Sequence, residues 1–268
     1  MTMIIGHRGA RNIWAENSLT GFRNVLELGI KAVELDLHLS DAGEVLVIHD
    51  ATLDRTADRS GPVRALSPEE RRAVRLRGPG GLTDDRVPIL EEVLEVLADH
   101  DVQLHVEIKH DENGRPYPGL AEKAADMLRH YKLADRAWLT CFDMTVLETC
   151  RQEAPEIRRL VSVNADWADR AGGMEAFLNK AKPLVDIIAV HHELMAAEWS
   201  RIVAMHPREK LCVWTVNDEQ GMRHWLGKGI GHLTTDSPDL ALRVYAAQSA
   251  EAEINLLERF PTNTSHLQ

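Results

Sequence analysis

The sequence predicts a single (β/α)8 barrel, a ring of eight parallel strands surrounded by helices. Three observations carry this prediction. Strand-like runs alternate with amphipathic, helix-like runs eight times along 268 residues, which is the usual repeat of such a barrel. No Gly/Ser-rich linker or break in composition divides the chain, so we expect one domain over residues 1–268. Charged and imidazole side chains also gather at the ends of several strand-like runs, where barrels place their reactive groups.

The eight expected strands are short segments, either apolar throughout or alternating between apolar and polar residues. In chain order they cover residues 3–7, 32–39, 103–109, 137–141, 158–163, 186–190, 210–216 and 232–235. Amphipathic stretches lie between them, and one example places Leu90, Val93, Leu94 and Leu97 on a single helical face. Each such stretch is expected to cross over from one parallel strand to the next.

One interval departs from this repeat. After the second strand, the sequence predicts an extra strand over 45–49, and about forty residues then follow before the next helix begins at Leu90. We therefore expect an insertion over one rim of the barrel, covering about residues 51–88. Within it, Ser67 has the pattern of an N-cap, followed by a proline and two acids, so a short helix is expected to begin there.

The C-terminal tail, about residues 251–268, is apolar at first and then polar. Its large apolar residues are Ile254, Leu256, Leu257 and Phe260. Packing against the bottom of the barrel and packing against a second subunit are both open, so a homo-oligomer is one expectation.

The composition excludes some classes of protein. With 31 Lys and Arg against 42 Asp and Glu, the formal net charge is −11, which argues against a general nucleic-acid binder because such proteins neutralise phosphates with basic residues. No apolar run approaches the roughly 20 residues of a membrane helix, and the first expected strand begins at Met3 and leaves no room for a signal peptide. We expect a cytoplasmic protein with a small-molecule partner, although a mature form cut from a longer precursor would read the same.

Two of the expected strands carry polar residues on one face. Side chains alternate between the two faces of a strand, so Glu34, Asp36 and His38 share one face. Glu107 and Lys109 share a face of another strand. A sheet with one face in water gives the same alternation, and that interpretation stays open for either strand taken alone.

Other polar residues also lie at or just after the carboxyl ends of expected strands. They are His7, Arg8, Glu16 and Asn17 at the first strand, His49 and Asp50 at the extra strand, and Trp214 and Asn217 at the seventh. Taken singly, a histidine at a strand end is more often a hydrogen-bonded structural residue, and an arginine there is more often part of a surface ion pair. These residues therefore indicate a function only through their order and spacing along the chain.

A series of short motifs runs from residue 6 to about residue 236. They are Gly6-His7-Arg8-Gly9-Ala10, Glu16-Asn17-Ser18, Glu34-Leu35-Asp36, Gly43-Glu44-Val45, His49-Asp50, Leu53-Asp54-Arg55-Thr56, Glu107-Ile108-Lys109, Phe142-Asp143 and Trp214-Thr215-Val216-Asn217. In order and spacing they resemble the signature of the glycerophosphodiester phosphodiesterase family. The resemblance implies a (β/α)8 barrel with a small insertion after the second strand, a divalent metal ion, and hydrolysis of a phosphodiester that has a glycerol arm.

The resemblance implies that Glu34, Asp36 and Glu107 are metal ligands, and their chemistry agrees. Three carboxylates buried together would repel one another strongly without a cation. Ligation by oxygen alone suits Mg²⁺, Ca²⁺ or Mn²⁺ better than Zn²⁺. The alternative is a structural ion-pair network, in which the acids pair with basic residues such as Lys109 and Arg8.

His7 and His49 are the candidate proton carriers. Hydrolysis of a phosphodiester needs one group to take a proton from the nucleophile and another to protonate the leaving alcohol, and histidine titrates in the right range. The resemblance implies that the neighbouring glycerol hydroxyl attacks first and that water then opens a cyclic phosphate. The residues alone do not tell which histidine is the acid and which is the base.

The family match also suggests roles for less specific residues. Arg8 and Lys109 are expected to bind the phosphoryl oxygens and to offset charge in the transition state. Glu16 is expected to join or support the metal site, and Asn17 and Asp50 to orient the catalytic histidines or their loops.

Several segments depart from the family pattern. Ala15 stands where the family usually has a proline. The loop over 110–117, His191 and His192 after the sixth strand, and His232 near the eighth add polar groups. They could bind a hydrophilic alcohol such as a sugar, and a solvated loop is the alternative.

The expected function is metal-dependent hydrolysis of a glycerophosphodiester to an alcohol and a glycerol 3-phosphate-type phosphomonoester. Trp214 would offer an apolar wall to the glycerol carbons, unless it belongs to the core. A related enzyme acting on a sugar-bearing, opine-like phosphodiester is an alternative. From a different class, the chain could be an inactive barrel that only binds phosphorylated ligands, and the intact motifs argue against that.

Overall fold

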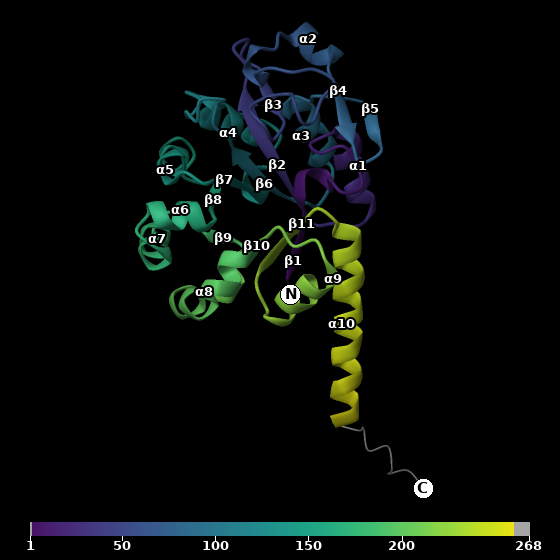
Figure 1. Ribbon diagram of the computed structural model, residues 1–268, viewed down its shortest axis with the longest axis vertical. Coiled ribbons are helices and arrows are strands. Elements are labelled where there is room, and N and C mark those ends of the chain that lie inside the picture. Colours follow the sequence, from purple (N-terminus) through teal and green to yellow (C-terminus); the bar gives the residue numbers. More distant parts are fainter. Residues whose placement is uncertain (1, 260–268) are drawn as a thin grey trace.

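The computed structural model describes residues 2–259, with side chains as far as Glu251, and it contains a closed barrel of eight parallel strands (Figure 1). The barrel strands are β1 Met3–Gly6, β2 Ala32–Leu39, β6 Gln103–Ile108, β7 Ala137–Cys141, β8 Arg158–Val163, β9 Ile187–His191, β10 Leu211–Trp214 and β11 His232–Thr235. Each pairs in parallel with its neighbour, and β1 closes the ring by pairing with both β2 and β11. The predicted (β/α)8 barrel is confirmed, and the expected strands agree with the observed ones to within two residues at each end.

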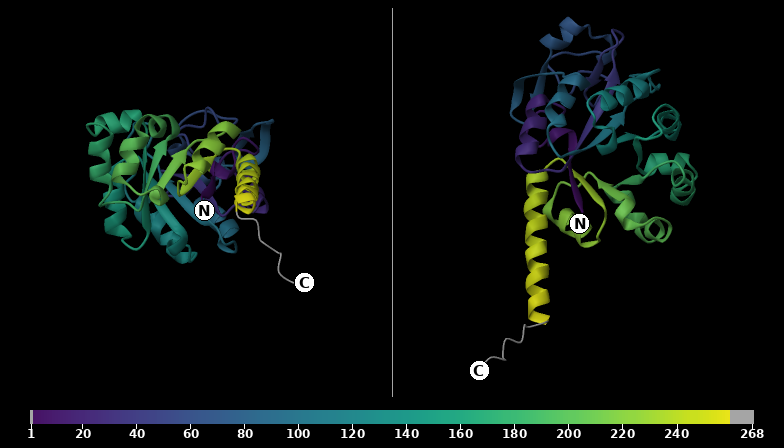
Figure 2. Two further views of the ribbon diagram at one scale, coloured as in Figure 1. Left: turned by 90° about the horizontal axis from the view of Figure 1, so that it is seen from below. Right: turned by 180° about the vertical axis from the view of Figure 1, so that it is seen from behind.

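Helices connect the strands and surround the barrel (Figure 2). They are α1 Leu19–Glu27, α3 Leu90–Ala98, α4 Leu120–His130, α5 Met144–Glu153, α6 Ala165–Arg170, α7 Met174–Ala181, α8 His192–Met205, α9 Glu219–Gly227 and α10 Pro238–Arg259. Because every crossover returns to the same end of the sheet, the carboxyl ends of all eight barrel strands gather at one rim.

Two apolar layers hold the strands in place. On the outside, Leu35, Val106 and Val213 belong to the large core between strands and helices. Inside the barrel, Trp138 and Leu160 belong to a smaller cluster. Full burial of an aliphatic side chain of this size contributes about 1.5–3 kcal/mol, so the strand positions that carry the polar residues are firmly fixed.

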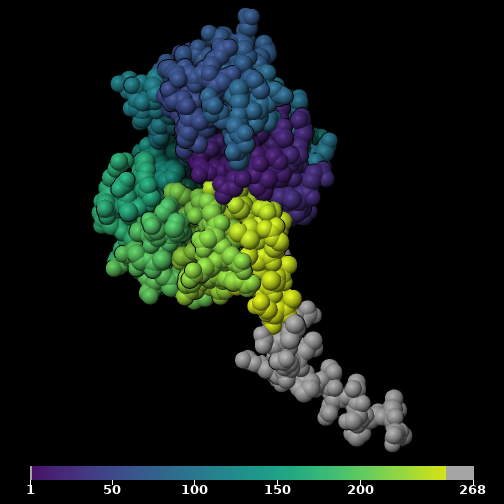
Figure 3. All heavy atoms as spheres, turned by 45° about the vertical axis from the view of Figure 1, so that its right-hand side comes forward, coloured from purple at the N-terminus to yellow at the C-terminus, as the bar shows by residue number. Residues whose placement is uncertain are grey.

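The insertion contains strands of its own. The predicted extra strand is present as β3, Val45–Val47, but it ends two residues earlier than expected, and it pairs antiparallel with β2. A hairpin formed by β4 Arg75–Gly78 and β5 Gly81–Arg86 was not predicted, because β5 is polar and largely exposed and shows no apolar alternation. In Figure 3 the insertion forms the blue part of the molecule, at the opposite end from the yellow helix α10.

The short helix of the insertion begins where the sequence predicts it. α2, Pro68–Ala73, starts after Ser67, whose hydroxyl accepts a hydrogen bond from the backbone N–H of Glu70. The Glu70 carboxylate accepts one from the backbone N–H of Ser67 in return, which completes a capping box. The insertion packs around an apolar cluster of its own that includes Leu53, Val63, Val74 and Leu76.

The last helix, α10, runs beyond the body of the barrel (Figures 1 and 2). The expectation that the tail packs through Ile254, Leu256, Leu257 and Phe260 lies outside the described side chains, so both arrangements stay predictions. Among residues 2–259, no helix has the length and apolar character needed to cross a membrane.

Candidate active site

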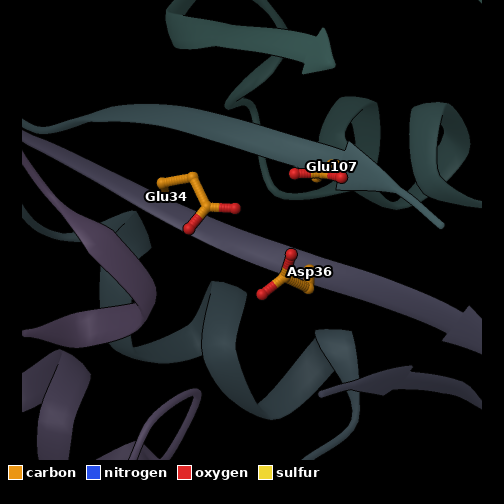
Figure 4. A group of neighbouring side chains, drawn as sticks. All are labelled: Glu34, Asp36 and Glu107. Atoms are coloured by element: carbon orange, nitrogen blue, oxygen red, sulfur yellow. The ribbon is translucent and has the colours of Figure 1, made fainter. Parts of the chain in front are cut away.

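Three acidic side chains meet inside the barrel near its carboxyl-end rim. Glu34 and Asp36 come from β2 and Glu107 from β6, where Asp36 and Glu107 are partners in the register. One carboxylate oxygen of each lies within 4.8 Å of those of the other two, and Figure 4 shows the carboxylates facing the same space from two neighbouring strands. Glu34 and Asp36 are buried and Glu107 is half-buried. The structure therefore brings together the three acids that the sequence singles out.

These carboxylates cannot all carry charge at low cost. Burial raises the pKa of Glu34 well above its usual value, and the charges of Asp36 and Glu107 raise it further. Burial also acts to raise the pKa of Asp36, but neighbouring cations, led by Lys109, outweigh it and hold that pKa well below its usual value. Glu34 is therefore the acid that most needs an additional positive charge.

The donor set fits a hard divalent cation. Glu34 Oε1 and Asp36 Oδ1 are buried and have no hydrogen-bond partner, whereas buried carboxylate oxygens are normally hydrogen-bonded or bound to a metal. Lys109 compensates only in part, since its Nζ lies 2.8 Å from Glu107 Oε1 and 3.4 Å from Asp36 Oδ1. Three converging carboxylates, two of which have a buried oxygen without a hydrogen-bond partner, are the kind of ligand set that Mg²⁺ and Ca²⁺ prefer.

Arg8 lies in a tight turn beside this cluster. It follows β1 in the 3-10 turn His7–Gly9 and has a left-handed φ of 51°. Its backbone N–H donates to Glu34 Oε2 at 3.1 Å, and its Nε lies 3.3 Å from Asp36 Oδ2. Its Nη1 donates to Glu16 Oε1 at 3.1 Å. The structure thus contains both a metal-type cluster and the ion pairs of the alternative interpretation, and the two are compatible.

His7 is held by a carboxylate from the other end of the chain. Its Nδ1 lies 2.5 Å from Asp236 Oδ1, and its Nε2 lies 3.7 Å from Glu34 Oε2. Burial lowers the pKa of His7, the Arg8 charge lowers it further, and Asp236 opposes both. With Nδ1 engaged, Nε2 is the nitrogen left to exchange a proton with a bound molecule.

Asp236 is a site residue to which the sequence analysis gave no role. It follows β11, and it also accepts a hydrogen bond of 2.7 Å from Asn217 Nδ2. Arg11 Nε lies 3.1 Å from Asp236 Oδ2, the same oxygen that accepts from Asn217. The sequence offers one signal for Asp236: it is an acid directly after the eighth strand, at the same rim as His7.

His49 is held in a similar way from the insertion side. Its Nδ1 lies 2.7 Å from Asp50 Oδ1, and Arg55 Nε donates to Asp50 Oδ2 at 2.6 Å. Arg55 also donates two hydrogen bonds to Glu16. The hydrogen bond from His49 and the Arg55 contacts hold the pKa of Asp50 far below its usual value, against the effect of burial. Asp50 is thus positioned to orient His49, as expected, while that role stays a prediction.

Glu16 and Asn17 have different surroundings. Glu16 lies outside the three-acid cluster and contacts it only through Arg8. Asn17 Nδ2 donates to Asp36 Oδ2 at 2.8 Å, and its backbone N–H donates to the carbonyl oxygen of Arg8, so it contacts both an acid and the turn that contains His7. Glu16 thus contacts a cation beside the cluster, and Asn17 contacts one of its acids.

His38 and Tyr117 form a chain that reaches the backbone of His49. The His38 Nε2 lies 3.0 Å from the carbonyl oxygen of His49, and its Nδ1 lies 3.0 Å from the hydroxyl of Tyr117. A carbonyl oxygen can only accept, so Nε2 carries the proton and Nδ1 accepts from Tyr117. Burial lowers the pKa of His38 to about 4, although the bond to His49 opposes the shift. His38 is therefore a neutral structural link between two loops.

The reactive groups open into one cavity of about 250 Å³, lined by both histidines, Arg8, Lys109 and two of the three acids. Trp214 also lines it and is half-buried, so its ring forms a wall of the cavity while packing against the apolar cluster inside the barrel. The Trp214 ring makes edge contacts with Phe142 at 5.5 Å and with His191 at 5.0 Å between centroids. His191 in turn stacks on the histidine that follows it, outside the cavity lining.

His232 lies far from the rim on which it was expected. It is the first residue of β11 and pairs in register with Cys212, while the carboxyl end of that strand is Thr235. Its ring lies 6.0 Å from that of His105, inside the barrel. The expectation that His232 helps to bind an alcohol at the rim is wrong, because the strand begins with this residue instead of ending near it.

Comparisons with known proteins agree with this geometry. The sequence matches the model of the glycerophosphoryl diester phosphodiesterase family over residues 7–240. It is 28% identical over 249 residues to the glycerophosphodiester phosphodiesterase of Caldanaerobacter subterraneus subsp. tengcongensis, across 91% of this chain and 97% of that protein. The crystal structure of a glycerophosphodiester phosphodiesterase from Agrobacterium tumefaciens has a TM-score of 0.70 at 26% identity, across 92% of this chain and 100% of that one. A phosphodiesterase from Oleispira antarctica, solved in complex with the product sn-glycerol-3-phosphate, has a TM-score of 0.75 at 22% identity, across 91% of this chain and 96% of that one.

Proposed function

This chain belongs to the glycerophosphoryl diester phosphodiesterase family, and from that premise we propose that it uses a divalent metal ion to hydrolyse a glycerophosphodiester to an alcohol and a glycerol 3-phosphate-type phosphomonoester. Membership of the family makes the chain a phosphoric diester hydrolase. One observation supports the finer proposal above all. Three buried or half-buried carboxylates converge beside two histidines that are each held by an acid, in one cavity.

Glu34, Asp36 and Glu107 would hold the metal ion, with Mg²⁺ or Ca²⁺ as the proposed ion and Mn²⁺ as an alternative. When bound, such an ion polarises phosphoryl oxygens and balances charge that develops on them. The supporting observation is the pair of buried carboxylate oxygens without a hydrogen-bond partner, together with the raised pKa of Glu34.

The two histidines would carry the protons. In both, an acid engages Nδ1 and leaves Nε2 for proton exchange, and both line the cavity, which suits one of them to take a proton from a glycerol hydroxyl and the other to protonate the departing alcohol. Asp236 and Asp50 would fix the ring orientations and stabilise the protonated forms.

Arg8 and Lys109 would bind the phosphoryl oxygens. Burial alone would lower the pKa of Lys109, but Glu107 and Asp36 outweigh it and raise that pKa, so the ammonium group keeps its charge. The Arg8 guanidinium is fixed between Asp36 and Glu16. Two fixed cations beside the acids can thus receive a phosphate without reorganising.

The glycerol-side product is supported by the relative from Oleispira antarctica, which was solved with sn-glycerol-3-phosphate. A sugar-bearing phosphodiester stays the alternative substrate, because the family match says nothing of the alcohol. A cytoplasmic location, the absence of other partners and the oligomeric state stay predictions.

Turnover with and without a chelator tests the proposal. We expect glycerophosphodiesters to be converted to a glycerol phosphate, detected by enzymatic assay of the phosphomonoester, and we expect loss of turnover after exhaustive chelation. Adding Mg²⁺, Ca²⁺ or Mn²⁺ should restore it. Full activity with no metal retained by elemental analysis would contradict the metal proposal, whereas binding of glycerol 3-phosphate without any turnover would indicate the inactive barrel.

A further inference from the structure

A second cavity, of about 380 Å³, adjoins the reactive one. The two cavities share His49, Glu107, Lys109 and Phe142, whereas His7 lines only the first. A phosphodiester has two organic arms on one phosphorus atom. If the phosphate lies among the shared residues, each cavity is placed to receive one arm.

The second cavity has an aromatic wall and polar edges. Its wall is formed by Phe142, which follows β7, and Trp167 on α6, with ring centroids 6.1 Å apart and planes inclined by 37°. The backbone N–H of Trp167 donates to the N-cap side chain of Asn164 at 3.1 Å, which fixes the start of α6. Asp50 and His110, both half-buried, supply the polar edges.

The charges around this cavity disfavour a cationic ligand. Among the residues that the structure describes, two carboxylates line it, and both are already paired: Asp50 with His49 and Arg55, and Glu107 with Lys109. Arg170 also places its guanidinium 5.2 Å from the centroid of the Trp167 ring. A quaternary ammonium group would find no free carboxylate among the described residues that line this cavity, and it would share the Trp167 ring with the Arg170 cation.

We propose that the second cavity binds the leaving alcohol, and that this alcohol is neutral and rich in hydroxyl groups, with an apolar face on the Trp167 ring. Polyols and sugar rings have such faces, and their hydroxyls can donate to Asp50 and bond to His110. This inference rests on the proposed function, and it adds the chemical class of the alcohol and the residue that selects it.

Truncation of Trp167 should lower kcat/KM by an amount that depends on the alcohol in the substrate. The probes are glycerophosphoinositol, glycerophosphocholine and the methyl ester of glycerol 3-phosphate, whose methanol is too small to reach Trp167. Trp167→Ala should lower kcat/KM for the inositol ester about tenfold and leave the methyl ester within about twofold. Trp167→Phe should retain most of the activity toward the inositol ester, because it keeps the aromatic face.

The matched control is Trp199→Ala. Trp199 is also half-buried, but it packs against Trp225 and lines neither cavity. We expect Trp199→Ala to change kcat/KM by the same factor for all three esters. An equal loss for all three esters in Trp167→Ala would overturn the inference, since it would indicate a general effect on the fold.

The preference for a neutral over a cationic alcohol has a separate test. Wild-type protein should favour the inositol ester over the choline ester in kcat/KM, and Arg170→Gln, a change at an exposed residue, should narrow that preference by about threefold or more. A wild-type preference for the choline ester, unchanged in Arg170→Gln, would overturn the class of alcohol. Absence of turnover with every ester would contradict the proposed function itself, whereas turnover without any effect of Trp167 would overturn only this inference.

Discussion

The two histidines, His7 and His49, are alike in chemistry but differ in their surroundings. Each has Nδ1 held by an acid, yet only His49 borders the second cavity. If the leaving alcohol lies there, His49 is the group that can protonate its oxygen, and His7 is left to take the proton of the glycerol hydroxyl. On this proposal, the two histidines have separate roles, which the sequence left open.

A change of leaving group tests this assignment. With an alkyl ester, His7→Ala and His49→Ala should each lower kcat by about 10²-fold or more. With glycerol 3-(p-nitrophenyl phosphate), the nitrophenolate leaves without protonation, so His49→Ala should lose less than about tenfold while His7→Ala still loses about 10²-fold. Rates of nitrophenolate release measure both, with metal content as the control. The reverse pattern would exchange the roles of the two residues.

His38 acts, in this structure, through the backbone of His49. Loss of one hydrogen bond of this kind costs about 0.5–1.5 kcal/mol, so we expect Tyr117→Phe and His38→Leu each to lower kcat by about two- to tenfold with little change in KM. Since both changes break the same chain, Tyr117→Phe should have no further effect in the His38→Leu background.

The conservative variant separates positioning from general stability. His38→Gln can still donate to the His49 carbonyl oxygen and accept from Tyr117, so it should restore most of kcat. Additive losses in the double variant, or a His38→Gln variant as slow as His38→Leu, would show that the Tyr117–His38 chain does not position His49.

At the scale of single elements, strand β11 carries a half-buried imidazole into the barrel interior. Burial lowers the pKa of His232 to about 4 and that of His105 to about 3, compared with about 6.5 for an exposed histidine. Between pH 6.5 and pH 4 the unfolded chain therefore binds protons at these residues that the folded chain does not. The free energy of unfolding must then fall as the pH is lowered through this window.

His232→Leu should remove one of these protonations. The variant should lose up to about 1.4 kcal/mol per pH unit from the slope of unfolding free energy against pH between about 6.5 and 4. Urea denaturation at a series of pH values measures that slope, and His100→Leu, a change at an exposed residue, serves as the control. An unchanged slope in His232→Leu would show that this imidazole is not held neutral by the fold.

Elements with strong periodicity were predictable and polar ones were not. β2 and β6 are recognisable because aliphatic residues alternate with polar ones. α2 is recognisable because its capping box lies within one short run, from Ser67 to Glu70. β5 has no such alternation, and it is held by its antiparallel pairing with β4 and by the contact of Thr20 with Asp85. The pairing with β4 is local but lacks an apolar pattern, and the contact between Thr20 and Asp85 joins residues 65 positions apart, which no local pattern predicts.

The same distinction applies to the site. Glu34 and Asp36 share a strand face, so their proximity follows from the strand itself. The pairing of His7 with Asp236 depends on closure of the barrel between β1 and β11, which brings together residues 229 positions apart. Only the folded ring reveals that contact.

At the scale of the whole molecule, the acidic cluster should couple metal binding to stability. Around the site, the three acids Glu34, Asp36 and Glu107 face the two cations Arg8 and Lys109, which leaves one negative charge in excess. A bound divalent ion stabilises the folded state by mass action, by about 2.7 kcal/mol when its concentration is a hundred times its dissociation constant. The metal-free protein, in contrast, bears the repulsion that raises the pKa of Glu34.

Glu34→Gln should therefore raise the melting temperature of the metal-free protein relative to wild type and lower that of the metal-bound protein. The glutamine can still accept the hydrogen bond from the Arg8 backbone N–H, but it removes the excess charge. After chelation, the melting temperature of Glu34→Gln should exceed that of wild type. With Mg²⁺ or Ca²⁺ added, wild type should gain several degrees and the variant little, so the order reverses. Calorimetry with KCl at matched ionic strength excludes a general salt effect. If divalent ions raise both melting temperatures equally, or the metal-free variant is the less stable protein, then the three carboxylates do not form the metal site.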